Sequence, residues 1–128
     1  MDVQKLVDHW VNSAEDDIKT VEALWESRRY HHCLFFCHLV VEKALKALVV
    51  RRTGEQALPV HNLIRLARDA GVKIPPEKEV DLEEINTFNV RARYQDYKLR
   101  FYKKATLEYT ERWKRRSLEM FQWLKGQI

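Results

Sequence analysis

The chain has 128 residues, the size of one ordinary domain, and its three Gly and three Pro are too few for a disordered or loop-rich chain. No apolar run reaches the ~18 residues that a membrane span requires, the N-terminus lacks the pattern of a secretion signal, and two cysteines cannot build a disulfide framework. We therefore expect one domain over residues 1–128, cytoplasmic and away from membranes, whose net charge of +4 permits a phosphate-bearing partner without requiring one.

Two long helices are predicted in the first half of the chain. Apolar residues recur at three- and four-residue spacing over residues 2–25, and Asp2 is placed to cap this first helix. The second helix is predicted over residues 29–52, with Gly54 as its stop. Because this helix is apolar nearly all round between Cys33 and Val41, we expect it to be the most buried element of the fold.

Three further helices are predicted after the break at Gly54. A short helix starts near residues 59–61 and ends at Gly71, another begins at Pro75 and continues towards residue 94, and the last spans residues 103–125. The last helix carries an inward stripe that consists of Thr106, Tyr109, Trp113, Ser117, Met120 and Leu124. Long amphipathic helices with short connections predict an all-α fold, namely an up-and-down antiparallel helical bundle of four main helices plus a short crossing helix.

A line of polar residues crosses the most apolar helix. His38, Glu42 and Lys46 are spaced four apart, so they share one face, and Lys43 lies beside Glu42. The line is explained either by an intrahelical ion pair with a histidine hydrogen bond, or by a ligand pocket or polar subunit interface. Asp17 lies close to the inward stripe of the first helix, where its carboxylate must either reach water or find a partner.

Two cysteines and several histidines near the start of the second helix resemble a metal site at first sight. Zinc needs about four ligands in a tetrahedral array, and the chain has no second cysteine pair to add to Cys33 and Cys37. Cysteines within an apolar helical run are more often small core residues, with a thiol pKa too high for catalysis. We therefore expect no metal and no cofactor.

The densest polar segment is residues 91–98, which holds two arginines, two tyrosines and an acid. Arginine offers a forked donor for phosphate and tyrosine a stacking face for a base, so the segment resembles a recognition site. An Arg–Asp pair that anchors the fourth helix to the bundle explains it equally well. His61, at a predicted helix start, either closes the turn or faces a ligand.

We expect the polar line of the second helix to face this segment. A buried polar group must be met by polar groups from neighbouring elements or lie in a wet cleft. Arg93 and Asp96 are the obvious complements of Glu42 and Lys46, while Asp17 lies near one edge and can pair with Lys43 or Arg93. If these groups only saturate one another, the site is structural; if a cleft remains, its chemistry suits a nucleotide.

Three blocks of sequence resemble the HEPN domain family. The blocks are Cys-His-Leu-Val-Val-Glu-Lys-Ala-Leu-Lys-Ala-Leu at residues 37–48, Val-His-Asn-Leu at residues 60–63 and Ala-Arg-Tyr-Gln-Asp-Tyr at residues 92–97. Asp17-Ile18 and the closing Trp-Leu-Lys-Gly-Gln-Ile also match, and the blocks follow the family's order over essentially the whole chain. Gln95 departs from the family's usual Pro, which predicts a looser turn there.

The resemblance implies a helical bundle that commonly forms a homodimer and is associated with nucleotide binding. Prokaryotic HEPN proteins are often encoded beside a minimal nucleotidyltransferase, in pairs that behave as toxin and antitoxin. Some HEPN domains are metal-independent ribonucleases with an R-x₄₋₆-H motif, in which Arg stabilises phosphate charge and His is the acid/base. No arginine of this chain has a histidine at that spacing, which argues against the ribonuclease form.

The predicted function is therefore a non-catalytic HEPN protein that binds a nucleotide, a minimal nucleotidyltransferase partner or both. The chain also holds four Trp, five Tyr and five Phe, which favours a homodimer because exposed aromatic patches mark interfaces. The candidate ligand-binding residues are Asp17, His38, Glu42, Lys43, Lys46, His61, Arg93, Tyr94, Asp96 and Tyr97.

Two alternatives stay open. One is a metal-independent ribonuclease with a rearranged Arg/His pair, such as Arg93 with His61. The other is an RNA-binding module that uses the basic last helix at Lys114, Arg115 and Arg116. These residues are also explained without a ligand, as a charged helix face exposed to solvent.

Overall fold

The computed structural model describes residues 1–90 and 95–128, and the regular elements in those two ranges are all helices. The six helices found there are α1 (Val3–Glu26), α2 (Tyr30–Thr53), α3 (Leu63–Asp69), α4 (Pro76–Asn86), α5 (Gln95–Lys104) and α6 (Leu107–Lys125). The predicted all-α class is confirmed. Over the same two ranges, no helix is long and apolar enough to cross a membrane.

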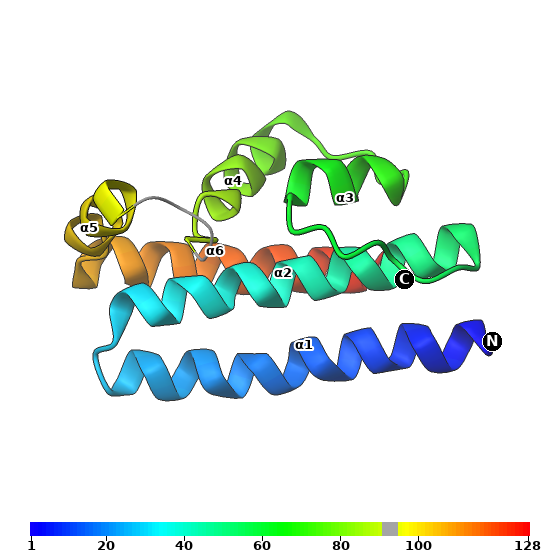
Figure 1. The fold of residues 1–128 in the computed structure, drawn as a ribbon, viewed down its shortest axis with the longest axis horizontal. Coiled ribbons are helices and arrows are strands. Elements are labelled where there is room, and N and C mark those ends of the chain that lie inside the picture. Colours follow the sequence, from blue (N-terminus) through cyan, green and yellow to red (C-terminus); the bar gives the residue numbers. More distant parts are fainter. Residues whose placement is uncertain (91–94) are drawn as a thin grey trace.

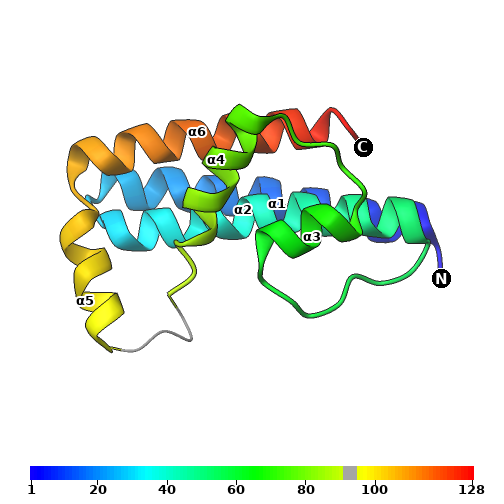
Figure 2. The ribbon, with the colours of Figure 1, turned by 90° about the horizontal axis from the view of Figure 1, so that it is seen from above.

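Three long helices lie side by side and form the body of the molecule. Figure 1 shows α1 and α2 packed antiparallel, with α6 behind α2 in that view. The helix α6 runs in the same direction as α2, and the chain returns between them through α3, α4 and α5 (Figures 1 and 2). The return limb of the bundle is thus a set of three short helices, with α4 crossing over α2 and α6.

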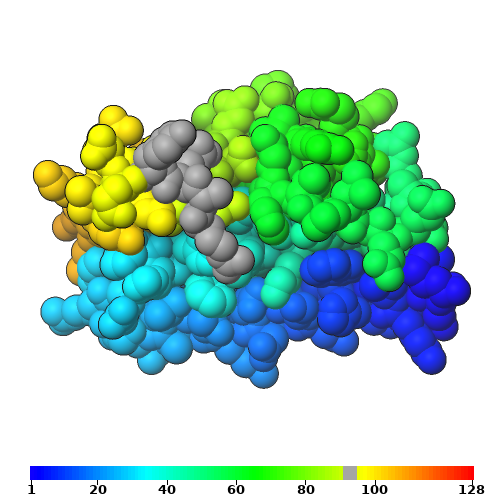
Figure 3. All heavy atoms as spheres, viewed as in Figure 1, coloured from blue at the N-terminus to red at the C-terminus, as the bar shows by residue number. Residues whose placement is uncertain are grey.

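The helix α2 is the centre of the core, as its composition predicts. Fourteen of its 24 residues are buried, and it contacts α1, α6, α3 and α4. In the space-filling view, the atoms of α3 and α4 cover the side of α2 that faces away from α1 (Figure 3). Gly54 ends α2 in the left-handed conformation, with φ of 71°, and its N–H donates to the carbonyl of Val50. Most residues of this helix are therefore covered by neighbouring elements.

The helix α3 begins later than predicted. Its first residue is Leu63, because the side chain of Asn62 accepts the backbone N–H groups of Ile64 and Arg65 and so caps the helix. His61 consequently precedes α3 and belongs to the connection from α2. The side chain of Asn86, at the end of α4, accepts the N–H of Leu63 at 2.8 Å and fixes the start of α3 against α4.

The predicted fourth helix is shorter in the structure, and a separate helix follows it. The helix α4 ends at Asn86, where the Thr87 hydroxyl and N–H both bond back to the carbonyl of Glu84 and Phe88 turns into the core. Gln95 opens α5, which the sequence pattern does not distinguish from its neighbours. The last helix starts at Leu107 and not at residue 103, because the Thr106 side chain caps it through the N–H of Tyr109.

Most of the described aromatic side chains pack in or against the hydrophobic core. Phe88 is fully buried, and its ring lies 5.9 to 6.2 Å from the rings of Phe101, Tyr109 and Trp113. Among the described aromatic residues, Tyr102 is the one with an exposed side chain, with 41% of its surface accessible. The aromatic content is thus explained by the core, and the homodimer stays a prediction that follows from the family resemblance.

Candidate functional site

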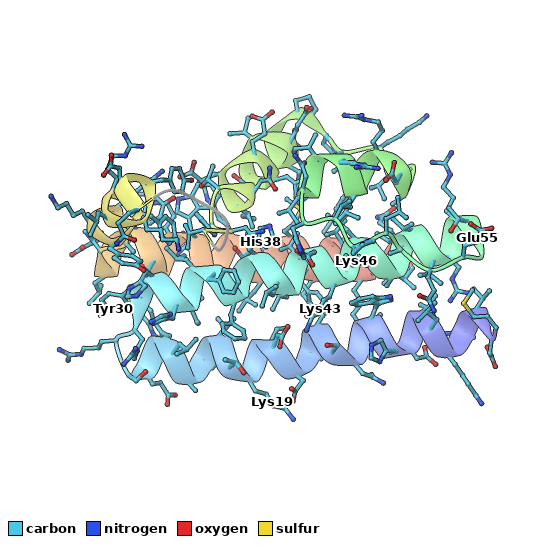
Figure 4. All side chains as sticks on the ribbon, viewed as in Figure 1. Lys19, Tyr30, His38, Lys43, Lys46 and Glu55 are labelled. Atoms are coloured by element: carbon cyan, nitrogen blue, oxygen red, sulfur yellow. The ribbon has the colours of Figure 1, made fainter. Side chains whose placement is uncertain are left out.

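A buried carboxylate organises the polar line of α2. Glu42 is 4% exposed, and its Oε2 lies 3.1 Å from Nζ of Lys46, one turn further along the same helix. Its Oε1 lies 3.1 Å from Nδ1 of His61 and 3.7 Å from Nδ1 of His38. We call His38, Glu42, Lys46 and His61 the Glu42 cluster. Three of its members come from one face of α2, where Figure 4 shows His38 and Lys46, and the fourth comes from the loop before α3.

The hydrogen bonds fix the tautomer of His38. Its Nε2 lies 3.1 Å from the backbone carbonyl of His61, and because a carbonyl can only accept, Nε2 carries the proton. The side chain is fully buried, and burial lowers its pKa from 6.5 to about 4, against the opposing pull of Glu42. His38 is therefore neutral near pH 7, and its Nδ1 has no hydrogen-bond partner among the described residues.

The stability of the protein is expected to depend on pH through His38. The unfolded chain protonates this side chain below about pH 6.5, whereas the native protein resists protonation down to about pH 4, so stability falls as the pH drops through that interval. The loss between pH 7 and pH 5 is about 2 kcal/mol. Denaturant unfolding across this range, compared between the parent and His38→Gln, measures it.

The His38→Gln variant keeps a donor for the His61 carbonyl but cannot titrate, so its stability should vary less with pH. A matched control is His9→Gln, because His9 is exposed on α1. Equal pH slopes for the parent and His38→Gln would show that His38 is not the titrating group.

A second ion pair joins α1 to α2. Nζ of Lys43 lies 2.6 Å from Oδ2 of Asp17 and donates to the hydroxyl of Ser13 at 2.8 Å. Figure 4 shows Lys43 between the two helices. Asp17 thus finds its partner in Lys43, one of the two partners considered from the sequence. Both side chains are mostly buried, so this pair fixes the register of α1 against α2.

Of the predicted recognition segment, the structure describes residues 95–98. They belong to α5 and are not members of the Glu42 cluster. Arg93 and Tyr94 lie outside the described residues. Asp96 is exposed in the first turn of α5, where a carboxylate suits the positive end of the helix dipole. The hydroxyl of Tyr97 donates to the backbone carbonyl of Thr87 at 2.9 Å, which ties α5 to the end of α4.

A pocket of about 190 Å³ lies between the start of α2 and α5. It is lined by His31, His32, Phe35, Val90, Lys98 and Tyr102, which are mostly aromatic and include one basic residue. The ring centroids of His31 and Tyr102 are 4.2 Å apart and the ring planes are tilted by 45°, so the two rings are in contact. Aromatic faces and a cation are the groups that a nucleobase and a phosphate require.

This aromatic pocket and the Glu42 cluster share one face of α2. Positions 31, 35, 38 and 42 follow one another at intervals of four, three and four residues, which is the spacing of a single helical stripe. At 1.5 Å per residue, Phe35 and Glu42 are roughly 10 Å apart along the helix. In the cluster, His61 is the accessible member, since 53% of its side chain is exposed while the other three are buried.

Two residues of α1 that contact the lysines of α2 are not predicted from the sequence. The ring of Trp10 faces Nζ of Lys46 at 5.2 Å, and Ser13 bonds to Lys43. Trp10 belongs to the apolar stripe of α1, so nothing in its sequence position indicates a polar contact. The contacts of Trp10 with Lys46 and of Ser13 with Lys43 depend on the register of α1 against α2, which only the packed structure defines.

The cysteines and the basic last helix fit their structural interpretations. Cys33 and Cys37 are fully buried in the core, and the Cys33 thiol together with burial raises the pKa of the Cys37 thiol well above its ordinary value. On α6 each of the three candidate basic residues faces a carboxylate, in the pairs Lys114–Glu22, Arg115–Glu119 and Arg116–Asp81. This pairing weakens the basic helix as a nucleic-acid surface.

Comparisons with known proteins agree with the fold. The model of the HEPN domain matches residues 7–127. The solved structure of ST0689, described as an archaeal HEPN homologue, is 19% identical over 94% of this chain and 96% of its own, with a TM-score of 0.72. The structure of TT1696 from Thermus thermophilus is 16% identical over 95% and 98% of the two chains, with a TM-score of 0.79. A search of curated proteins gave no significant match.

Proposed function

Because the chain belongs to the HEPN domain family, we propose that it is a non-catalytic HEPN protein that binds a nucleotide along the polar face of α2. The observation that carries this proposal is that the aromatic pocket and the Glu42 cluster share one face of α2, where Phe35 and Glu42 lie roughly 10 Å apart along the helix and Glu42 holds half-exposed His61. That separation suits a mononucleotide whose base lies against His31 and Tyr102 and whose phosphate lies towards His61.

The Glu42 cluster acts here as a scaffold for His61. Glu42 accepts Nδ1–H of His61, so the opposite ring nitrogen, Nε2, is left for a ligand. Nε2–H of His38 donates to the backbone carbonyl of His61 and so fixes the backbone of His61. The other three members are buried, so their role is to position His61 and not to contact the ligand.

The proposal predicts that two separated substitutions weaken nucleotide binding. Tyr102→Ala removes part of the aromatic wall and His61→Ala removes the phosphate contact, and each is expected to raise the Kd for AMP about tenfold. Both side chains are at least two-fifths exposed, so the variants should keep the fold. Isothermal titration calorimetry measures the affinities, and circular dichroism verifies that helix content is unchanged.

The matched controls are Leu99→Ala on α5 and His9→Ala on α1, which are exposed residues outside the proposed site. Both should bind AMP like the parent. Failure of the parent to bind any nucleoside monophosphate would contradict the proposal, as would unchanged binding in both site variants.

One observation favours the ribonuclease alternative. A carboxylate that holds Nδ1–H of a histidine, with the far nitrogen accessible, is the arrangement of a general base, and His61 and Glu42 have it at 3.1 Å. This alternative predicts cleavage of single-stranded RNA in excess chelator that is lost in His61→Ala. The absence of an R-x₄₋₆-H motif makes binding the better supported function.

The family resemblance extends the proposal to protein partners. We propose a homodimer that associates with a minimal nucleotidyltransferase in a toxin–antitoxin-like pair. Sedimentation of the purified protein tests the dimer. A neighbouring gene that encodes a nucleotidyltransferase, and whose product purifies together with this chain, would support the pairing.

A further inference from the structure

A basic surface pocket lies at the far end of α2 from the aromatic pocket. It has a volume of about 410 Å³ and is lined by Arg51 and Arg52 from α2, Gly71 and Lys73 from the turn after α3, and Gln127 after α6. Figures 1 and 2 show the end of α6 beside the last turns of α2. Three of the lining side chains are cationic, and none of the residues that line it is Asp or Glu.

These cations lack the partners that other basic residues of the protein have. Six lysines and arginines elsewhere lie within 3.2 Å of a carboxylate, and they are Lys43, Lys46, Lys104, Lys114, Arg116 and Lys125. Within the described ranges, no carboxylate lies within 4.0 Å of Arg51, Arg52 or Lys73. Arg51 donates to the neutral amide of Gln4, which leaves its charge uncompensated.

The guanidinium of Arg52 lies close against the turn after α3. Gly71 adopts φ of +67°, and a Cβ built there would lie 1.9 Å from Nη1 and 2.6 Å from Cζ of Arg52. The glycine thus serves two purposes: it accepts the left-handed conformation, and its missing side chain makes room for the guanidinium. Arg52 is therefore packed against the turn that also carries Lys73.

The end of α2 does not cancel this positive charge. The negative end of a helix dipole arises from carbonyls without partners in the last turn. Here the carbonyl of Val50 accepts the N–H of Gly54 and that of Val49 accepts the hydroxyl of Thr53, both at 2.8 Å. Of the four carbonyls that end the helix, that of Val50 is thereby satisfied, and the remaining partial charge of about −0.5 is smaller than the three positive charges, so the pocket keeps a net positive field.

We propose that this pocket binds a chain of phosphate groups, either as free polyphosphate or as the triphosphate of a nucleotide. Forked guanidinium donors and a lysine suit the oxygens of adjacent phosphates, and the pocket volume is within the range of small-ligand sites. The site is separate from the nucleotide face of α2 and does not depend on the function proposed for it.

Calorimetric titration with sodium tripolyphosphate tests the proposal at low salt, about 0.05 M, where charges are little screened. The parent is expected to bind, and Arg52→Gln and Lys73→Gln should each raise the Kd about tenfold. Lys19→Gln makes the same change of charge on an exposed side chain that Figure 4 shows pointing away from the body, and it should bind like the parent. Circular dichroism of all variants verifies the fold.

Two further arms identify the source of the phosphates and separate this site from the nucleotide face. His61→Ala should bind tripolyphosphate like the parent. ATP binding that matches tripolyphosphate would show that only the phosphates are recognised, while tighter ATP binding that is still weakened by Arg52→Gln would identify a nucleotide as the ligand. Absence of tripolyphosphate binding in the parent, or unchanged affinity in both Arg52→Gln and Lys73→Gln, would overturn the proposal.

Discussion

Replacing Glu42 with methionine is expected to lower the free energy of unfolding by about 3–5 kcal/mol. The substitution leaves Nζ of Lys46, now 3.1 Å from the carboxylate, without an anionic partner. Lys46 is 5% exposed and lies against the ring of Trp10, so its charge cannot reach water without a shift of α1 against α2. Equilibrium unfolding in urea measures the loss.

A double variant distinguishes the buried pair from simple side-chain removal. Glu42→Met with Lys46→Met removes both charges and keeps similar side-chain volume, so it should recover most of the stability lost in Glu42→Met. If the single and double variants are equally unstable, the unpaired ammonium of Lys46 is not the cause. The Glu42 cluster would then not have the electrostatic role assigned to it here.

The second large effect is expected at Phe88. Phe88→Ala should lower the free energy of unfolding by about 3–5 kcal/mol, because it empties a fully buried site between α4, α5 and α6. The ring lies 5.9 Å from that of Phe101 and 6.2 Å from that of Trp113, so its loss removes a contact shared by all three helices. Thermal and urea unfolding measure the change.

Leu99→Ala provides the control for Phe88→Ala. Leu99 belongs to α5 but is 48% exposed, so its truncation should change the free energy of unfolding by about 0.5 kcal/mol at most. A loss for Phe88→Ala no larger than for Leu99→Ala would contradict the central position given to the Phe88 ring.

The long helices are the part of the fold that the sequence predicts well. Their apolar spacing is a local signal, and so are the residues that cap them. Asp2 accepts the N–H of Lys5 at the start of α1, and Gly54 takes the left-handed conformation after the end of α2. Each boundary can therefore be found within a few residues of its predicted place.

The return limb is predicted less well, because its boundaries depend on contacts distant in sequence. The helix α4 ends where Phe88 enters a cluster of rings from α5 and α6, and no local signal near residue 88 shows that destination. The start of α3 differs in this respect. Asn62 before an apolar run is a recognisable cap, and it should have placed His61 outside the helix.

The candidate site likewise contains contacts that the sequence predicts and contacts that it does not. The spacing of His38, Glu42 and Lys46 predicts a shared face and an intrahelical pair, and both are present. The contact of His61 with Glu42 spans 19 residues, and it follows from how the α2–α3 loop folds back over α2. Sequence spacing cannot supply such a contact, although both residues are recognisable as candidates on their own.

Nucleotide binding along α2 is tested most directly by NMR spectra of the imidazole nitrogens recorded while AMP is added. The proposal predicts saturable shifts at His61 and His31, at the two ends of the proposed site, and none at His9, which is exposed on α1. Spectra in which His61 and His31 stay unchanged, or in which His9 moves to the same extent, would contradict it.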